Sequence, residues 1–165
     1  MSTNYDTSYE RNHQKRVHEE LRNAGVSWLG LYKFTSRYVP RVIGLKEHIK
    51  AVVFGRQKEA EGFFGVIGGG LVATNARIIY IDHRPGYTTM DEISYGVVSG
   101  MNMAQAGPYA SLTLYTKIGN YHLSFAKPDC VRRFAAYIDM RRLSEAEHYN
   151  LPSDSNFRQP HQVRP

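Results

Sequence analysis

The feature that most constrains the fold is a change in the spacing of the apolar residues along the chain. Between about 43 and 126 they recur at every second position, in short runs separated by turn residues. The run 109–116, for example, places Ala110, Leu112 and Leu114 on one face and polar or aromatic residues on the other. Alternation of this kind is typical of strands buried on one face, whereas the segment after residue 127 has helical spacing. The pattern predicts a β-sheet followed by a single helix.

Seven such runs are short and close together, which favours an antiparallel sheet. We expect the last of them to direct Tyr121, Leu123 and Phe125 to one face. A sheet of this size must close or be covered to protect its apolar face. The predicted strands are 48–54, 63–74, 77–82, 87–93, 95–103, 109–116 and 121–126.

The helical segment begins at Pro128, a residue suited to the first helical position, and Asp129 favours the positive end of the helix dipole. Its apolar residues form one stripe along the helix. The stripe consists of Val131, Phe134, Ala135 and Ile138.

The glycine run Gly68–Gly70 raises the question of a phosphate-binding loop. Such a loop leads into a helix whose N-terminal amides face the phosphate, but here the glycines lead into the apolar run LVAT. We therefore predict a strand bulge or a sharp bend at the glycines. Thr74 and Asn75 are suited to the turn that follows.

Residues before the sheet favour two helices. The first extends over 9–24 and ends at Gly25, and the second is capped by Ser27 and ended by Pro40. Their narrow apolar stripes suggest helices that pack on another element. The predicted organisation is a disordered N-terminus (1–8), a helical extension (9–42), the sheet with its helix (43–145) and a disordered tail (146–165).

The net charge of +6 invites a nucleic-acid or membrane interpretation, but the basic excess is spread along the chain. Without a basic stripe, nucleic-acid binding is not favoured. We expect a cytoplasmic protein, because we find no apolar stretch of the signal-peptide or membrane-spanning kind. The lone Cys130 cannot form an internal disulfide, which agrees with a reducing compartment.

Catalytic and metal-binding patterns are absent from the sequence. The seven histidines include no HxH or HxxxH pair, Cys130 has no CxxC partner, and there is no GxSxG motif. Asp91 and Glu92 are adjacent, so on a strand they face opposite sides. We predict no catalytic residue, cofactor or metal, and an unrecognised enzyme remains only a third alternative.

Four segments carry a resemblance to the bacterial YokE-like family of pleckstrin-homology (PH) domains. They are VPRVIGLKEHIKAVVFG (39–55), GLVATNARIIYID (70–82), MDEISYGVVSGMN (90–102) and PDCVRRFAAYID (128–139). The resemblance implies a mainly β fold with α: a PH-like, bent barrel of seven antiparallel strands capped by the C-terminal helix. It also implies a binding module for lipids, peptides or proteins.

In eukaryotic PH domains, basic residues around the loop between the first two strands bind inositol phosphates. Lys50, Arg56 and Lys58 fall in that region and are our candidate residues for anionic lipid, although Glu59 and Glu61 lie in the same loop. This supports a peripheral membrane module as the alternative function.

The leading hypothesis is a non-enzymatic module that binds a protein partner or a second copy of itself. The N-terminal extension is rich in the aromatic residues that anchor interfaces. The candidate interface residues are Trp28, Leu31, Tyr32 and Phe34. We favour packing of the extension on its own barrel over packing on a partner.

Overall fold

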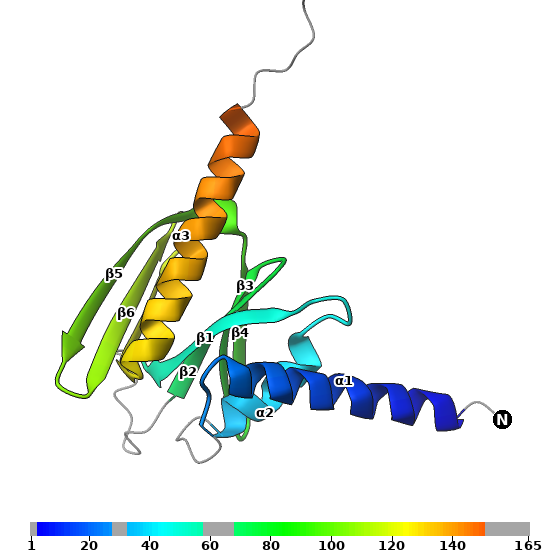
Figure 1. The fold of residues 1–165 in the computed structure, drawn as a ribbon. Helices are drawn as coiled ribbons and strands as arrows, with labels where there is room; N and C mark the ends of the chain where they lie inside the picture. Colours follow the sequence, from blue (N-terminus) through cyan, green and yellow to red (C-terminus); the bar gives the residue numbers. More distant parts are fainter. Residues whose placement is uncertain (1–2, 28–32, 58–67, 151–165) are drawn as a thin grey trace, which may run out of the picture.

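The computed structural model describes residues 3–27, 33–57 and 68–150 (Figure 1). The order of elements agrees with the sequence prediction of two N-terminal helices, seven strands and a C-terminal helix. The helices are α1 (Thr3–Asn23), α2 (Lys33–Val42) and α3 (Pro128–Asn150), with a short 3-10 turn η1 (Tyr95–Val97). The strands are β1 (Ile49–Arg56), β2 (Gly68–Thr74), β3 (Ile78–Arg84), β4 (Tyr87–Ile93), β5 (Val98–Ala106), β6 (Tyr109–Thr116) and β7 (Asn120–Ala126).

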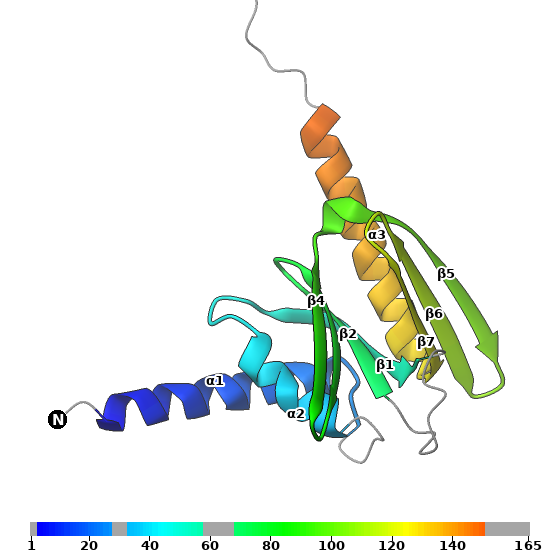
Figure 2. The same ribbon diagram turned by 180° about the vertical axis from the view of Figure 1, so that it is seen from behind.

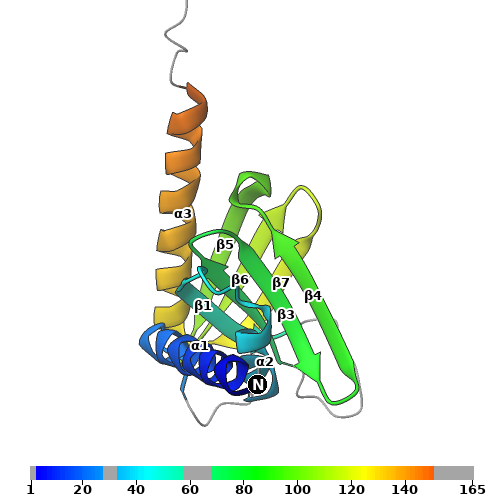
Figure 3. The same cartoon turned by 90° about the vertical axis from the view of Figure 1, so that its right-hand side faces the viewer.

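All strand pairs are antiparallel, in the order β4-β3-β2-β1-β7-β6-β5. β1 joins the two halves of the sheet where Arg56 pairs with Ser124 of β7. The sheet curls around α3 as a half-barrel, with β4 and β5 at its two edges (Figure 3). The predicted bent barrel with a capping helix is confirmed.

The inside of the half-barrel is filled by apolar side chains. Phe134 and Ile138 of α3 are fully buried, and they belong to one cluster with Leu71 of β2 and with Leu112 and Leu123 of the other half. Complete burial of a side chain of this size contributes about 1.5–3 kcal/mol. The α3 stripe predicted from the sequence therefore closes the core.

Helices α1 and α2 cover the outer face of β1, β2 and β3 (Figure 1). Val17 of α1 and Val39 of α2 are fully buried in a second cluster that includes Val52 and Phe54 of β1. β1 is thus buried on both faces, which departs from the alternation expected for 48–54. The extension packs on its own barrel, as we favoured.

Three helix boundaries differ from expectation. α1 begins at Thr3, inside the segment predicted to be disordered. α3 continues to Asn150, past the predicted start of the tail. Pro40 lies inside α2 rather than ending it: the Ile43 amide still donates to the Val39 carbonyl (3.1 Å), and the burial of both side chains offsets the helical bond that proline lacks.

The glycines of β2 are in regular register with β1, so of the two predicted alternatives the bulge is wrong, and the bend stays a prediction. Gly70 pairs with Phe54, and a Cβ on Gly70 would lie 2.4 Å from that ring. A Cβ on Gly69 would lie 3.0 Å from the Tyr80 hydroxyl. The absence of side chains in β2 therefore leaves room for aromatic rings of the two neighbouring strands.

Candidate functional site

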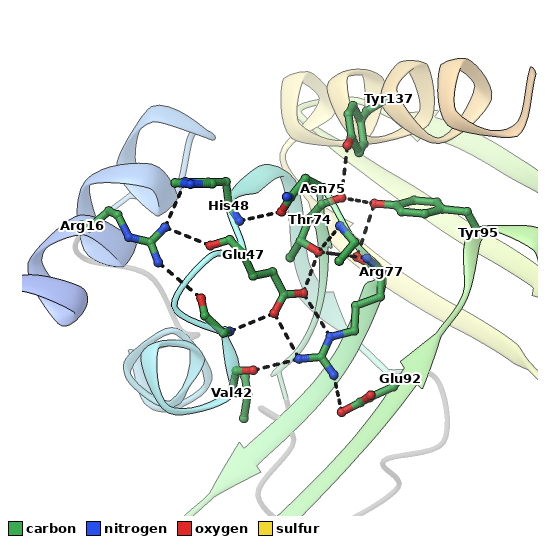
Figure 4. Close-up of polar contacts among 12 residues, drawn as sticks. Arg16, Val42, Glu47, His48, Thr74, Asn75, Arg77, Glu92, Tyr95 and Tyr137 are labelled. Carbon is green, nitrogen blue, oxygen red and sulfur yellow. Dashed lines mark hydrogen bonds and ion pairs between the residues drawn. The ribbon is translucent and has the colours of Figure 1, made fainter. Parts of the chain in front are cut away.

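A polar junction joins the N-terminal extension to the barrel at the β2–β3 turn (Figure 4). The Thr74 hydroxyl accepts hydrogen bonds from the amides of Ala76 (3.1 Å) and Arg77 (3.0 Å), which is the turn chemistry expected of this residue. The Asn75 carboxamide oxygen accepts from the His48 amide (2.7 Å), just before β1. The turn thus holds the start of β1 through side-chain contacts.

Glu47 is the centre of this junction. Its buried carboxylate accepts hydrogen bonds from Arg77 Nε (3.0 Å) and Nη2 (3.1 Å), from the Gly44 amide (2.9 Å) and from the Thr74 hydroxyl (2.7 Å). Burial by itself would raise the pKa of Glu47, but these hydrogen bonds outweigh it and the pKa lies below its ordinary value. Arg77 also pairs with Glu92 of β4.

Two further groups extend the junction to α1 and α3. Glu20 of α1 accepts from the Ile49 amide (2.8 Å) and pairs with Arg16, while Tyr137 of α3 donates to the Thr74 carbonyl (3.1 Å). Tyr95 donates to the same carbonyl. The donors and acceptors at the centre of the junction satisfy one another within the chain, so this arrangement stabilises the fold and does not resemble a site prepared for a ligand.

A different cluster faces solvent where β1, β7 and the start of β6 meet. The Phe125 ring is 53% exposed, lies 4.9 Å from the Arg56 guanidinium and contacts Tyr109 edge to face with ring centroids 5.7 Å apart. Tyr109 is 51% exposed. We call Arg56, Tyr109 and Phe125 the aromatic cluster.

A bulge in β7 orients Phe125. Leu123 pairs with Leu112 and Ala126 with Ala110, so two residues of β7 lie opposite one residue of β6. Phe125 has a φ of 56°, a left-handed conformation that costs a residue with a side chain about 1–2 kcal/mol. The prediction that Phe125 shares a face with Leu123 is wrong, because the bulge turns Phe125 outward and places Ala126 in the core.

The aromatic cluster borders a surface with very little charge. Charged residues make up 22% of the chain, yet Lys117 is the only Lys, Arg, Asp or Glu between 98 and 126. α3 packs on the inner side of this half of the sheet, and none of the helices in the described residues packs on its outer face (Figures 1 and 2). Within the part of the chain that the structure describes, the outer face of β5–β7 is therefore uncovered, and its side chains are mostly small polar and aromatic. The missing charge was visible in the sequence, but the bulge was not.

The structure separates the residues proposed for lipid binding. Lys50 is exposed near the start of β1 and Arg56 is at its end, which places them about 20 Å apart along the strand. Lys58 lies outside the described residues. Arg56 instead contacts an aromatic ring.

The proposed interface residues of the extension are only partly within the described chain. Trp28, Leu31 and Tyr32 lie outside the described residues, and Phe34 lies in the first turn of α2.

The described residues hold no group of three or more His, Cys, Asp or Glu that could bind a metal ion. Burial raises the pKa of the Cys130 thiol, which disfavours the reactive thiolate. Among the helices described, none is long and apolar enough to cross a membrane.

No model of a known protein family matches the chain, and no curated protein is significantly similar in sequence. Solved structures with a similar arrangement include a DUF1696 family protein with a PH domain from Shewanella loihica PV-4. It is 16% identical, with a TM-score of 0.42 over 69% of this chain and 98% of that one. The PH domain of USP37 is 8% identical, with a TM-score of 0.39 over 59% of this chain and 97% of that one.

Proposed function

We propose that this chain is a non-enzymatic, cytoplasmic module of the YokE-like PH type that binds another protein through the outer face of β5–β7. The observation that carries the proposal is the aromatic cluster at the border of this face. Tyr and Arg are enriched among the residues that dominate binding energy, and interface centres are depleted of charge. Tyr-rich, Ser- and Asn-containing surfaces are also typical of protein-binding loops in antibodies.

The backbone of Phe125 supports the same interpretation. A left-handed phenylalanine is unfavourable, and its ring is left half exposed instead of entering the core. Strained residues of this kind occur preferentially at binding and active sites. A surface role for the ring explains why an exposed aromatic stands at this position.

Site-specific photo-crosslinking in the source cell tests the proposal. A benzoylphenylalanine in place of Tyr109 is expected to form adducts with a protein partner, whereas the same group in place of Tyr87, an equally exposed tyrosine on the opposite half of the sheet, is expected to form none. Truncation of a dominant interface residue costs about 2 kcal/mol or more, so Phe125→Ser should weaken recovery of that partner about 30-fold. Equal labelling from both positions would refute the proposed surface.

An anionic membrane surface is the alternative ligand, and the contact between Arg56 and the exposed Phe125 is the observation in its favour. Flotation with phosphatidylserine vesicles at low and high salt measures binding to an anionic membrane. Salt should weaken that binding, because electrostatic attraction is screened over about 8–10 Å at ordinary ionic strength. Lys50 and Lys58 are the other proposed contacts, and their charge reversal should abolish flotation if a membrane is the ligand.

The aromatic residues of the extension remain a second proposed contact. The photoreactive group in place of Tyr32 tests that contact separately. The full proposed set is Trp28, Leu31, Tyr32 and Phe34.

A further inference from the structure

Strand β5 is an edge of the sheet that has neither the charged residues nor the proline by which edge strands are often protected. It is nine residues long, VSGMNMAQA, and contains no charged residue and no proline. Proteins commonly place such residues on edge strands, because an exposed row of amides and carbonyls can pair with another chain. The opposite edge, β4, does carry charges at Asp91 and Glu92. The difference identifies β5 as the edge open to strand pairing.

The apolar side chains of β5 are also incompletely covered. Met103 pairs across the sheet with Leu112, so the two share the inner face. Leu112 is fully buried, but Met103 is 50% exposed. Met101, two residues earlier on the same face, packs only partly against the core. An additional strand beside β5 would cover both methionines.

We propose that the strand that pairs with β5 is β5 of a second copy of this chain, antiparallel and related by a twofold axis at Asn102. This inference rests on the proposed function, since it takes the β5–β7 half as the interacting part of the chain and names one partner. Asn102 is the middle residue of β5, so this register pairs equal lengths of both strands on either side of the axis. At the N-terminal end of β5 the pairing is limited by the register shift before Gly100 and by the contact of the Ser99 carbonyl with Arg142. The register places Met101 opposite the partner's Met103 and Gly100 opposite the partner's Ala104.

This register brings no charges together. Every residue of β5 meets an uncharged residue of the copy, and an interface formed by one surface with itself is compatible with a twofold axis. The basic group at this edge is Arg142 of α3, which donates to the Ser99 carbonyl (3.2 Å). Ser99 is three residues from the axis, so the two Ser99 positions lie about 20 Å apart along the paired strands. That separation exceeds the screening length of about 8–10 Å, and the net charge of +6 opposes pairing only weakly.

Sedimentation velocity of the full chain from about 1 to 100 µM tests the inference. We expect a monomer–dimer equilibrium. Asn102→Lys places two like charges across the axis, on a side chain that is exposed in the monomer, and should weaken the dimer about tenfold or more. Met90→Lys adds the same charge to the β4 edge and should leave the equilibrium unchanged. A monomer over the whole range, or an undiminished Asn102→Lys dimer, would overturn the inference.

Disulfide trapping is a second measurement that does not depend on a charge. Opposite residues of an antiparallel pair have Cβ atoms about 4.5–5.5 Å apart, near the range of a disulfide. Asn102→Cys should therefore give a covalent dimer under mild oxidation, whereas Thr88→Cys on β4 should not. Equal trapping of both variants would contradict the register.

The two proposals fail in different ways. If the group at Tyr109 captures other proteins while the chain sediments as a monomer, the proposed function stands and the β5 dimer is wrong. If the chain dimerises through β5 and the group at Tyr109 captures nothing, the dimer stands and the outer face is not the binding surface.

Discussion

Glu47→Gln is the change that tests the polar junction most sharply, because it removes a charge and keeps the shape of the side chain. In the native chain each carboxylate oxygen accepts two hydrogen bonds. One oxygen accepts from Arg77 Nε and the Thr74 hydroxyl, and the other from Arg77 Nη2 and the Gly44 amide. A carboxamide presents an NH₂ group at one of these two positions. On the Gly44 side it meets donors only. On the other side it meets Arg77 Nε and the Thr74 hydroxyl, whose oxygen already accepts from the amides of Ala76 and Arg77.

The expected loss in the free energy of unfolding follows from the hydrogen bonds that the variant cannot form. With the NH₂ group on the Gly44 side, the variant loses one hydrogen bond from a charged donor, about 1.5–3 kcal/mol, and one neutral hydrogen bond, about 1 kcal/mol. Breaking a fully buried ion pair costs about 3–5 kcal/mol. The Arg77 side chain is 27% exposed and keeps Glu92 and the Val42 carbonyl as partners, so we expect the lower part of that range. The free energy of unfolding should fall by about 3 kcal/mol.

Urea denaturation at neutral pH measures this loss, and Glu92→Gln is the matched control. Glu92 pairs with the same guanidinium, but its side chain is 54% exposed, and such pairs contribute about 0–1 kcal/mol. A cost for Glu47→Gln no larger than that of Glu92→Gln would refute the central role of Glu47.

The pH dependence gives an independent check. The pKa values of Glu20 and Glu47 are lowered in the folded chain, so their contribution to stability is fully present above the ordinary value of 4.5 and is lost as the pH falls below it. The stability difference between the native chain and Glu47→Gln should therefore shrink between pH 5 and pH 3. A difference that stays constant over this interval would show that the charge of Glu47 is not responsible.

Three further predictions concern packing, the aromatic cluster and the thiol. Gly70→Ala should lower the free energy of unfolding by about 1–3 kcal/mol, because its Cβ would overlap the Phe54 ring. Gly100→Ala is the control: its Cβ would have no neighbouring atom within 4 Å, so it should cost under 1 kcal/mol. Similar costs at both sites would contradict the packing argument. Phe125→Asn should leave the free energy of unfolding within about 1 kcal/mol, since relief of the left-handed strain offsets lost ring contacts. It should nevertheless weaken partner recovery at the outer face about 30-fold, as expected for Phe125→Ser, and undiminished recovery would argue against the cluster. Cys130 should react with a thiol reagent much more slowly in the folded chain than in urea, because it is buried and its pKa is raised, and rapid native labelling would count against this packing.

Local spacing was sufficient to predict β6, and it predicted β5 and β7 in part: residues 95–97 of the predicted strand 95–103 form η1, and β5 continues to Ala106. Ala110, Leu112 and Leu114 of β6 are buried as predicted, because this strand has one covered face and one open face. Gly25 has the left-handed φ (99°) expected at the end of α1, and Thr74 forms the expected turn. Each of these features depends on a few neighbouring residues and on the general preference of one face for the core.

The expectation of alternation missed the two strands that are covered on both faces, although their sequences carry a signal for it. The apolar runs of β1 and β3 are continuous rather than alternating, as is typical of strands buried on both faces. The cover is supplied by Val17 and Val39, from helices far away in the chain. The separation of Lys50 from Arg56 likewise follows from the length of β1 once it is a regular strand.

The features of the candidate site fall into the same two groups, those that local sequence determines and those that depend on tertiary structure. The sequence by itself determined the order of strands and helices, the inner face of most strands and the lack of charge between 98 and 126, because these depend on composition and on spacing along the chain. Only the tertiary structure decided that Phe125 points outward beside Arg56 and Tyr109, and that β5 is an open edge. Register and edge position are properties of strand pairing, and a bulge of one residue reverses the face of every side chain that follows it.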